Sequence, residues 1–157
     1  MRNFVLGVED SLVSTVGLLS GIAVADTPRE TILLAGLVLI FVEALSMAAG
    51  SFLSEASAER YLTKREVVSS TSLVSGTIMF FSYFIAGFVP LAPYIFLPLD
   101  SAFWVSISAS LAALFILGVG GAKISQTNLL KGGIRMLLIG GIALGVGVGV
   151  GMFLGAV

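Results

Sequence analysis

The sequence contains no cysteine and no histidine, and only 11% of its 157 residues are charged. These absences exclude disulfides, thiolate nucleophiles, imidazole metal ligands and every histidine acid or base. The low charge excludes an ordinary soluble domain, in which about 25% of residues are charged. The net charge of −1 provides no basic surface for nucleic acid. We therefore expect an integral membrane protein with no nucleic-acid partner and no resident cofactor.

Long apolar runs account for most of the chain. A membrane-spanning helix needs about 20 mostly apolar residues, and the sequence offers five such runs. They lie at residues 4–25, 29–52, 67–89, 100–122 and 134–157. We expect Pro90 and Pro93 to end the third run, because proline cannot continue a helix. The helical pattern of the second run predicts a polar extension over residues 53–66. Residues 1–157 should thus form a single all-α transmembrane domain.

The basic residues predict the orientation of this domain. Seven of the eight Lys and Arg residues fall on one side of a five-helix arrangement, and only Arg29 falls on the other. The seven are Arg2, Arg60, Lys64, Arg65, Lys123, Lys131 and Arg135. Since Lys and Arg are retained on the cytoplasmic side of short loops, the N-terminus should lie inside and the C-terminus outside. A prokaryotic plasma or inner membrane and a vacuole-like organelle both fit this pattern.

Three acidic residues, Glu9, Asp10 and Glu43, fall inside predicted spans. An ionisable group there costs roughly 2.5 to 3.5 kcal/mol on insertion scales, so it indicates function. At about 1.5 Å per residue, Asp10 and Glu43 lie roughly 9 and 14 Å from the ends of their antiparallel helices and can meet. No Lys or Arg lies as deep, Arg135 being the nearest. Protons or a bound cation must therefore balance the acids.

A methionine adds a softer ligand to this acidic pair. Glu43 and Met47 are one turn apart on the same helix face, and a thioether favours transition metals over magnesium or calcium. Ferrous iron and manganese fit a carboxylate and thioether set best. The candidate metal ligands are Asp10, Glu43 and Met47, with Glu9, Ser14 and Ser46 as weaker candidates.

Small residues form stripes that indicate close helix packing. Asp10 continues into a stripe of Ser14, Gly17 and Gly21, which should face protein, with a second copy of the chain as a candidate partner. Two stripes in the last span should also pack tightly. They are Gly141, Gly145 and Gly149, and Gly147, Gly151 and Gly155.

The polar extension presents a further acidic stripe, because Glu55, Glu59 and Glu66 would lie within about 40° of one another on a helix. We expect a cation-collecting entrance on the cytoplasmic side. A solvated helix face is the ordinary alternative.

Structural explanations remain open for each candidate ligand. Asp10 could be an N-cap if the first helix begins late. Glu43 could be protonated or paired with Arg135, and Met47 could fill a gap in the core. At the level of function, an organic-cation/proton antiporter of the small multidrug type and a non-transporting scaffold subunit are the alternatives to a metal transporter.

Several motifs resemble those of the vacuolar iron transporter family. In sequence order these are Asp10-Ser11-Leu12-Val13-Ser14-Thr15-Val16-Gly17, Glu43-Ala44-Leu45-Ser46-Met47-Ala48-Ala49-Gly50, Ser57-Ala58-Glu59-Arg60-Tyr61, Pro90-Leu91-Ala92-Pro93-Tyr94 and Gly133-Ile134-Arg135-Met136-Leu137-Leu138-Ile139-Gly140. The resemblance covers essentially the whole chain. It implies a five-helix homodimer, a transporter and not an enzyme, that moves ferrous iron or related divalent metals out of the cytosol in exchange for protons. It also implies that Asp10 and Met47 lie on a pathway at the dimer interface.

Two features differ from that family pattern. Many members have Glu after the motif glycine, where this chain has Ser51. Plant members insert a Glu-rich cytoplasmic metal-binding domain between the second and third helices, whereas this chain has only a short polar segment there. Metal storage or delivery by such a domain is therefore not expected.

The predicted topology can be tested by cysteine accessibility, since the chain has no cysteine of its own. A single Lys64→Cys substitution should place a thiol in the cytoplasm, where an impermeant reagent reaches it only after the membrane is opened. Labelling of this thiol from outside intact cells would contradict the orientation.

Overall fold

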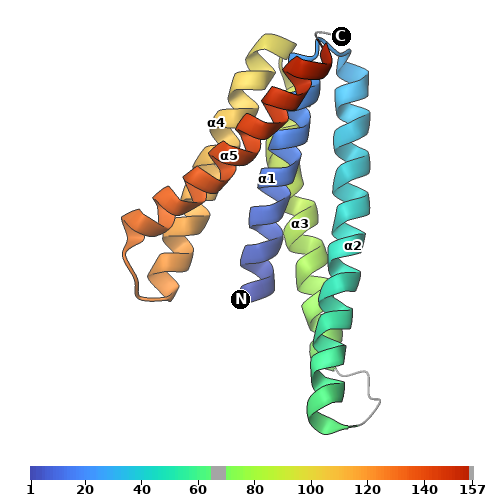
Figure 1. Ribbon diagram of the computed structural model, residues 1–157, viewed down its shortest axis with the longest axis vertical. Helices are drawn as coiled ribbons and strands as arrows, with labels where there is room; N and C mark the ends of the chain where they lie inside the picture. The colour runs from blue at the N-terminus through green and yellow to red at the C-terminus, as the bar shows by residue number, and fades with distance from the viewer. Residues whose placement is uncertain (65–69, 156–157) are drawn as a thin grey trace.

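The computed structural model is a bundle of helices, five of which are long and apolar enough to cross a membrane. The structure describes residues 1–64 and 70–155. The helices are α1 (Arg2–Val24), α2 (Arg29–Thr63), α3 (Ser70–Phe96), α4 (Leu99–Ile124) and α5 (Leu129–Gly155). Successive helices run in opposite directions, so the N-terminus and the end of α5 lie at opposite ends of the bundle (Figure 1). The predicted all-α arrangement of five spans is confirmed.

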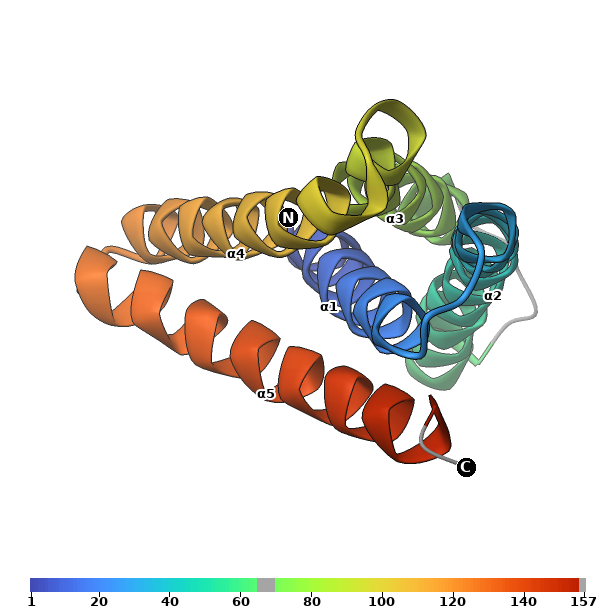
Figure 2. The ribbon, with the colours of Figure 1, turned by 90° about the horizontal axis from the view of Figure 1, so that it is seen from above.

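α1 is the central helix and contacts each of the other four (Figure 2). Its sequence suits this place, because its buried positions include several small or hydroxyl-bearing residues that let neighbours come close. α2 packs on α3, and α4 packs on α5. One buried apolar cluster takes side chains from four helices, α1, α2, α3 and α4. Its members are Leu19, Ile32, Ile40, Leu91, Tyr94 and Ala102.

Glycine backbones bring α1 and α5 into direct contact. A methyl group added at Gly21 would lie 2.5 Å from the carbonyl oxygen of Gly147. Methyl groups added at Gly147 and Gly151 would likewise run into the backbone of α1. The predicted close contact of the α1 stripe at Gly17 and Gly21 is therefore confirmed. Its partner within the chain is α5.

The two glycine stripes of α5 differ in their surroundings. Gly147 and Gly151 pack on α1, and Gly155 packs on Ala25, as predicted. The other stripe has open space at every position, so the expectation of tight packing there is wrong within one chain. The open positions are Gly141, Gly145 and Gly149. Both stripes have the same four-residue glycine spacing, so the sequence predicts tight packing for both. Only the placement of α1 against one of them shows which stripe packs.

The prediction that Pro90 and Pro93 end the third helix is wrong, because α3 continues through both to Phe96. The amide of Leu97 donates to the Pro93 carbonyl at 2.9 Å, so helical hydrogen bonding resumes beyond the prolines. From α4, the Ser106 hydroxyl donates to the Pro90 carbonyl at 2.7 Å. This contact ties the proline-containing turn to α4, and contacts from neighbouring helices help membrane helices to tolerate proline.

The other helix ends show where polar side chains extend or stop a span. α5 begins at Leu129, before the predicted start at 134, because the Asn128 side chain accepts a hydrogen bond from the amide of Lys131 at 3.1 Å. α2 continues beyond its apolar run to Thr63, as predicted, and ends at Lys64 in a left-handed conformation. Glu66 lies outside the described residues.

Basic residues gather at one end of the bundle, named here the basic end. It holds the N-terminus, the end of α2, the end of α4 and the start of α5 (Figure 1). Its described members are Arg2, Arg60, Lys64, Lys123, Lys131 and Arg135. Arg29 lies at the far end, where its guanidinium donates to the carbonyl of Leu97 after α3. A local capping contact thus accounts for Arg29, the one basic residue at that end among the described residues.

The α1–α5 contact predicts opposite effects for two neighbouring glycines. Gly147→Ala should destabilise the fold by about 1–3 kcal/mol, since the added methyl collides with the backbone of Gly17. Gly145→Ala is the matched control, because its methyl meets open space and alanine favours helix by about 1 kcal/mol. Thermal unfolding of the purified variants in detergent measures both. Equal stability of the two variants would contradict the packing.

Candidate functional site

Asp10 of α1 and Glu43 of α2 come together inside the bundle. Both side chains are half-buried, and their carboxylates interact electrostatically. Asp10 is preceded by a full two turns of helix, since α1 begins at Arg2, so the N-cap alternative for Asp10 is excluded. Two acidic groups from antiparallel helices thus lie close enough to interact, and they remain candidates for one site.

Tyr83 of α3 completes the site and was missed by the sequence analysis. Its side chain is fully buried, its hydroxyl lies 2.8 Å from the Ser14 hydroxyl, and it interacts electrostatically with Asp10 and Glu43. The Ser11 hydroxyl fixes the backbone here by donating to the Tyr83 carbonyl at 2.6 Å. The available signal was a tyrosine in mid-span, whose hydroxyl needs a buried partner.

Met47 and Ser46 occupy different surroundings on α2. Met47 is half-buried, one turn from Glu43 toward the basic end. Ser46 is exposed on the outside of the chain. The chain therefore offers two carboxylates, two hydroxyls and a nearby thioether on the facing sides of α1, α2 and α3.

Glu9 lies next to Asp10 in sequence but faces a different cavity. This cavity, of about 300 Å³, is formed by α1, α4 and α5 and is also lined by Arg135. Arg135 makes no ion pair with Glu9, Asp10 or Glu43 in the part of the chain that the structure describes. Pairing with Arg135 therefore does not explain Glu43, and Glu9 is separated from the Asp10 site.

The predicted entrance acids lie beyond Met47 on the extension of α2. Glu55 forms an ion pair with Arg2 at 3.4 Å, a partner from α1 that helical spacing within α2 could not reveal. One carboxylate oxygen of Glu59 is buried without a hydrogen-bond partner among the described residues. Glu66 falls in the segment outside them.

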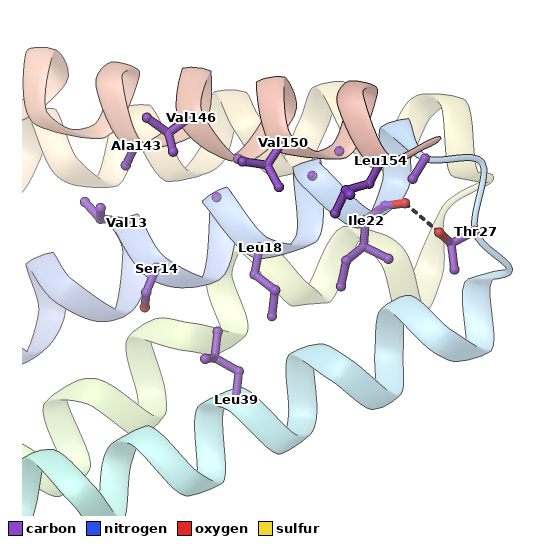
Figure 3. Close-up of a pocket in the computed structure, with 15 residues that line it drawn as sticks. Val13, Ser14, Leu18, Ile22, Thr27, Leu39, Ala143, Val146, Val150 and Leu154 are labelled. Atoms are coloured by element: carbon purple, nitrogen blue, oxygen red, sulfur yellow. Dashed lines mark hydrogen bonds between the residues drawn. The ribbon is translucent and has the colours of Figure 1, made fainter. Parts of the chain in front are cut away.

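A long apolar groove of about 760 Å³ runs from the site toward the far end, between α1, α2 and α5 (Figure 3). Ser14 marks its inner end and Thr27 its outer end. Thr27 is occupied by a hydrogen bond to the Ile22 carbonyl at 2.8 Å. The groove thus exposes one side of the Asp10 helix along its apolar length.

The acidic side chains that the structure describes in one chain are not enough to hold a metal ion by themselves. Among residues 1–64 and 70–155, no group of three or more acidic side chains is placed to hold a metal ion. Asp10 and Glu43 form a pair only. A metal bound here needs ligands of other kinds or from another copy of the chain.

Comparison with known proteins identifies relatives over nearly the whole chain. A sequence model of the VIT family matches residues 1–70 and 62–152. An uncharacterised protein of Methanocaldococcus jannaschii is 30% identical over 154 residues, covering 87% of this chain and 80% of its own. Vacuolar iron transporter 1 of Tulipa gesneriana is 24% identical over 203 residues, covering 91% of this chain and 82% of its own. Vacuolar iron transporter homolog 2 of Oryza sativa subsp. japonica is 27% identical, with coverages of 92% and 85%.

Five apolar helices around a buried polar site define a multi-pass membrane protein. The family match includes the first four of these helices and α5 as far as residue 152. The chain belongs to the VIT family, which confirms the resemblance seen in its motifs.

The Ser14–Tyr83 hydrogen bond predicts energetic coupling between the two residues. Ser14→Ala and Tyr83→Phe each remove this bond, so the double variant should lose about 0.5–1.5 kcal/mol less than the sum of the single losses. Thr15→Ala with Tyr83→Phe is the control, because the buried Thr15 hydroxyl has no partner among the described residues. Thermal stability in detergent gives both cycles. Additive losses for Ser14 and Tyr83 would contradict the contact.

Proposed function

We propose that this protein transports a divalent metal ion, ferrous iron or manganese, out of the cytosol in exchange for protons. The observation that carries the proposal is the pairing of Asp10 and Glu43 in an apolar bundle, with no basic side chain against them in the described structure. Two relatives named as a vacuolar iron transporter and a homolog of one support the metal. An acidic site at mid-membrane depth favours transport over catalysis.

The ligand chemistry favours the same substrates. Carboxylate and hydroxyl oxygens bind hard and borderline cations, and the Met47 thioether favours softer transition metals. Asp10 and Glu43 bind the ion when deprotonated, with Met47 beside them. Protonation of the two carboxylates removes the charge that holds the ion and releases it. One site therefore binds either metal or protons, which couples their movements in opposite directions.

A homodimer would supply the ligands that one chain lacks. Manganese is typically held by about six oxygen ligands, whereas the charged ligands that one chain offers at this site are two carboxylates. The apolar groove beside Ser14 exposes the Asp10 helix to a second copy. Packing two copies there would double the acidic groups at the site. We therefore include the dimer in the proposal.

The basic end is proposed to face the cytosol, since Lys and Arg are retained on that side. The metal then enters past the acidic extension of α2. Glu55 and Glu59 are the described acids of that entrance, and Glu66 is expected to extend it. The membrane is a prokaryotic plasma or inner membrane or a vacuole-like organelle.

Substitutions in the site test the proposal through Mn²⁺ uptake into proteoliposomes. Asp10→Asn combined with Glu43→Gln should abolish uptake, because no charged ligand remains, and Met47→Ala should reduce it. Glu9→Gln is the matched control, since Glu9 is a half-buried acid of the same helix that lines a separate cavity. Full uptake by the double variant, with correct folding, would refute the site.

A further inference from the structure

Hydrogen bonds tie the first turn of α1 to both α2 and α3 at the basic end. The Asn3 side-chain amide donates to the Ser51 hydroxyl at 3.0 Å and also to the Ser75 hydroxyl. The two hydroxyls are themselves 3.4 Å apart. These three side chains, Asn3, Ser51 and Ser75, are called the clasp below. Each comes from a different helix, so the clasp closes one layer of the bundle.

The clasp lies directly between the metal site and the basic end. In α1 the clasp residue precedes Asp10 by seven residues. In α2 it follows Glu43 by eight residues, and in α3 it precedes Tyr83 by eight. These spacings correspond to roughly 10–12 Å along each helix. The clasp and the site are therefore two parallel layers on the same three helices.

Close packing also joins α3 to α2 and to α1 near this level. A methyl group added at Gly76 of α3 would lie 3.0 Å from the carbonyl oxygen of Ala48 in α2. A methyl group added at Gly7 of α1 would lie 3.1 Å from the Met79 sulfur of α3 and collide with the Ser82 hydroxyl. α3 is thus held against both α2 and α1 beside the clasp. Between α1 and α2, the Asn3–Ser51 hydrogen bond of the clasp makes the link.

The chemistry of the clasp suits a closure better than a binding site. Its groups are neutral, and they satisfy one another by hydrogen bonds. Neutral hydrogen bonds contribute little net free energy, so they can be broken and remade. The clasp therefore holds α1 in place without trapping a cation.

The exposed ion pair beside the clasp links its opening to the entrance. Arg2 precedes Asn3 and pairs with Glu55, one turn beyond Ser51 on α2. A movement of the α1 end that breaks the clasp also separates Arg2 from Glu55. The same movement thus frees an acidic group for an incoming cation.

We propose that Asn3, Ser51 and Ser75 form a gate that closes the route from the basic end to Asp10 and Glu43. The structure is closed at this gate, and opening requires the start of α1 to part from α2 and α3. The role of the gate in metal entry rests on the proposed function. Its closure of the site does not, and the two can be tested separately.

Accessibility of a reporter thiol tests the closure without any transport. Met47→Cys places the only thiol of the chain one turn from Ser51 and one turn from Glu43. In detergent-solubilised protein, a charged thiol reagent should label this cysteine about fivefold faster when Asn3→Ala is added, the effect of one or two lost neutral hydrogen bonds on opening. Ser75→Ala should act in the same direction and serves as the second gate variant.

Asn128→Ala is the control for this measurement, because Asn128 caps α5 at the same end without touching the clasp. It should leave the labelling rate unchanged. Equal rates in the parent and both gate variants, or the same rise in the control, would overturn the gate.

A reversible crosslink then tests whether the gate must open for metal. Asn3→Cys with Ser75→Cys, in the otherwise unchanged chain, should lose Mn²⁺ uptake on oxidation and regain it on reduction. Uptake by the oxidised pair equal to that of the reduced pair would overturn the gate. Absence of uptake in the parent protein contradicts the proposed function instead, and the labelling rates still decide the closure.

Discussion

Two carboxylates that share one position inside an apolar bundle are the constraint on which the structure depends. Asp10 and Glu43 repel each other when both are charged, and no basic group faces them in the described residues. Neutral donors come near instead, because the Ser14 and Tyr83 hydroxyls bond each other beside the acids. The charge of the site is thus left for a mobile ion or proton to balance, which is the physical basis of the proposed exchange.

The central position of α1 follows from what its faces carry. One face approaches α5 through glycine, where any side chain would collide with backbone. Another face uses hydroxyls, and Ser11 donates to the carbonyl of Tyr83 on α3. A third face presents Asp10 toward Glu43 of α2 and Ser14 toward Tyr83 of α3. The single helix α1 therefore both packs the bundle together and carries part of the site. A movement of its first turn would be transmitted along the helix to Asp10, two turns further on.

The sequence predicts the parts of this structure that depend on local pattern. The lengths of the apolar runs predict five spans. The positions of Asp10 and Glu43 along their antiparallel helices predict that the two side chains lie at similar depths. The errors come from contacts between helices, which no local pattern encodes. α3 continues through Pro90, whose carbonyl accepts a hydrogen bond from Ser106 of α4, and Gly21 packs on α5 of the same chain. Tyr83 joins the site because of how α3 packs, so its role could only be seen once the helices were placed.

Direct coupling between metal and proton movement is the central claim. Proteoliposomes loaded with a pH dye and exposed to Mn²⁺ measure both fluxes at once. Exchange predicts that an acidic interior accelerates Mn²⁺ uptake and that the internal pH rises as the metal accumulates. Uptake that is independent of the pH gradient and leaves the internal pH unchanged would contradict it.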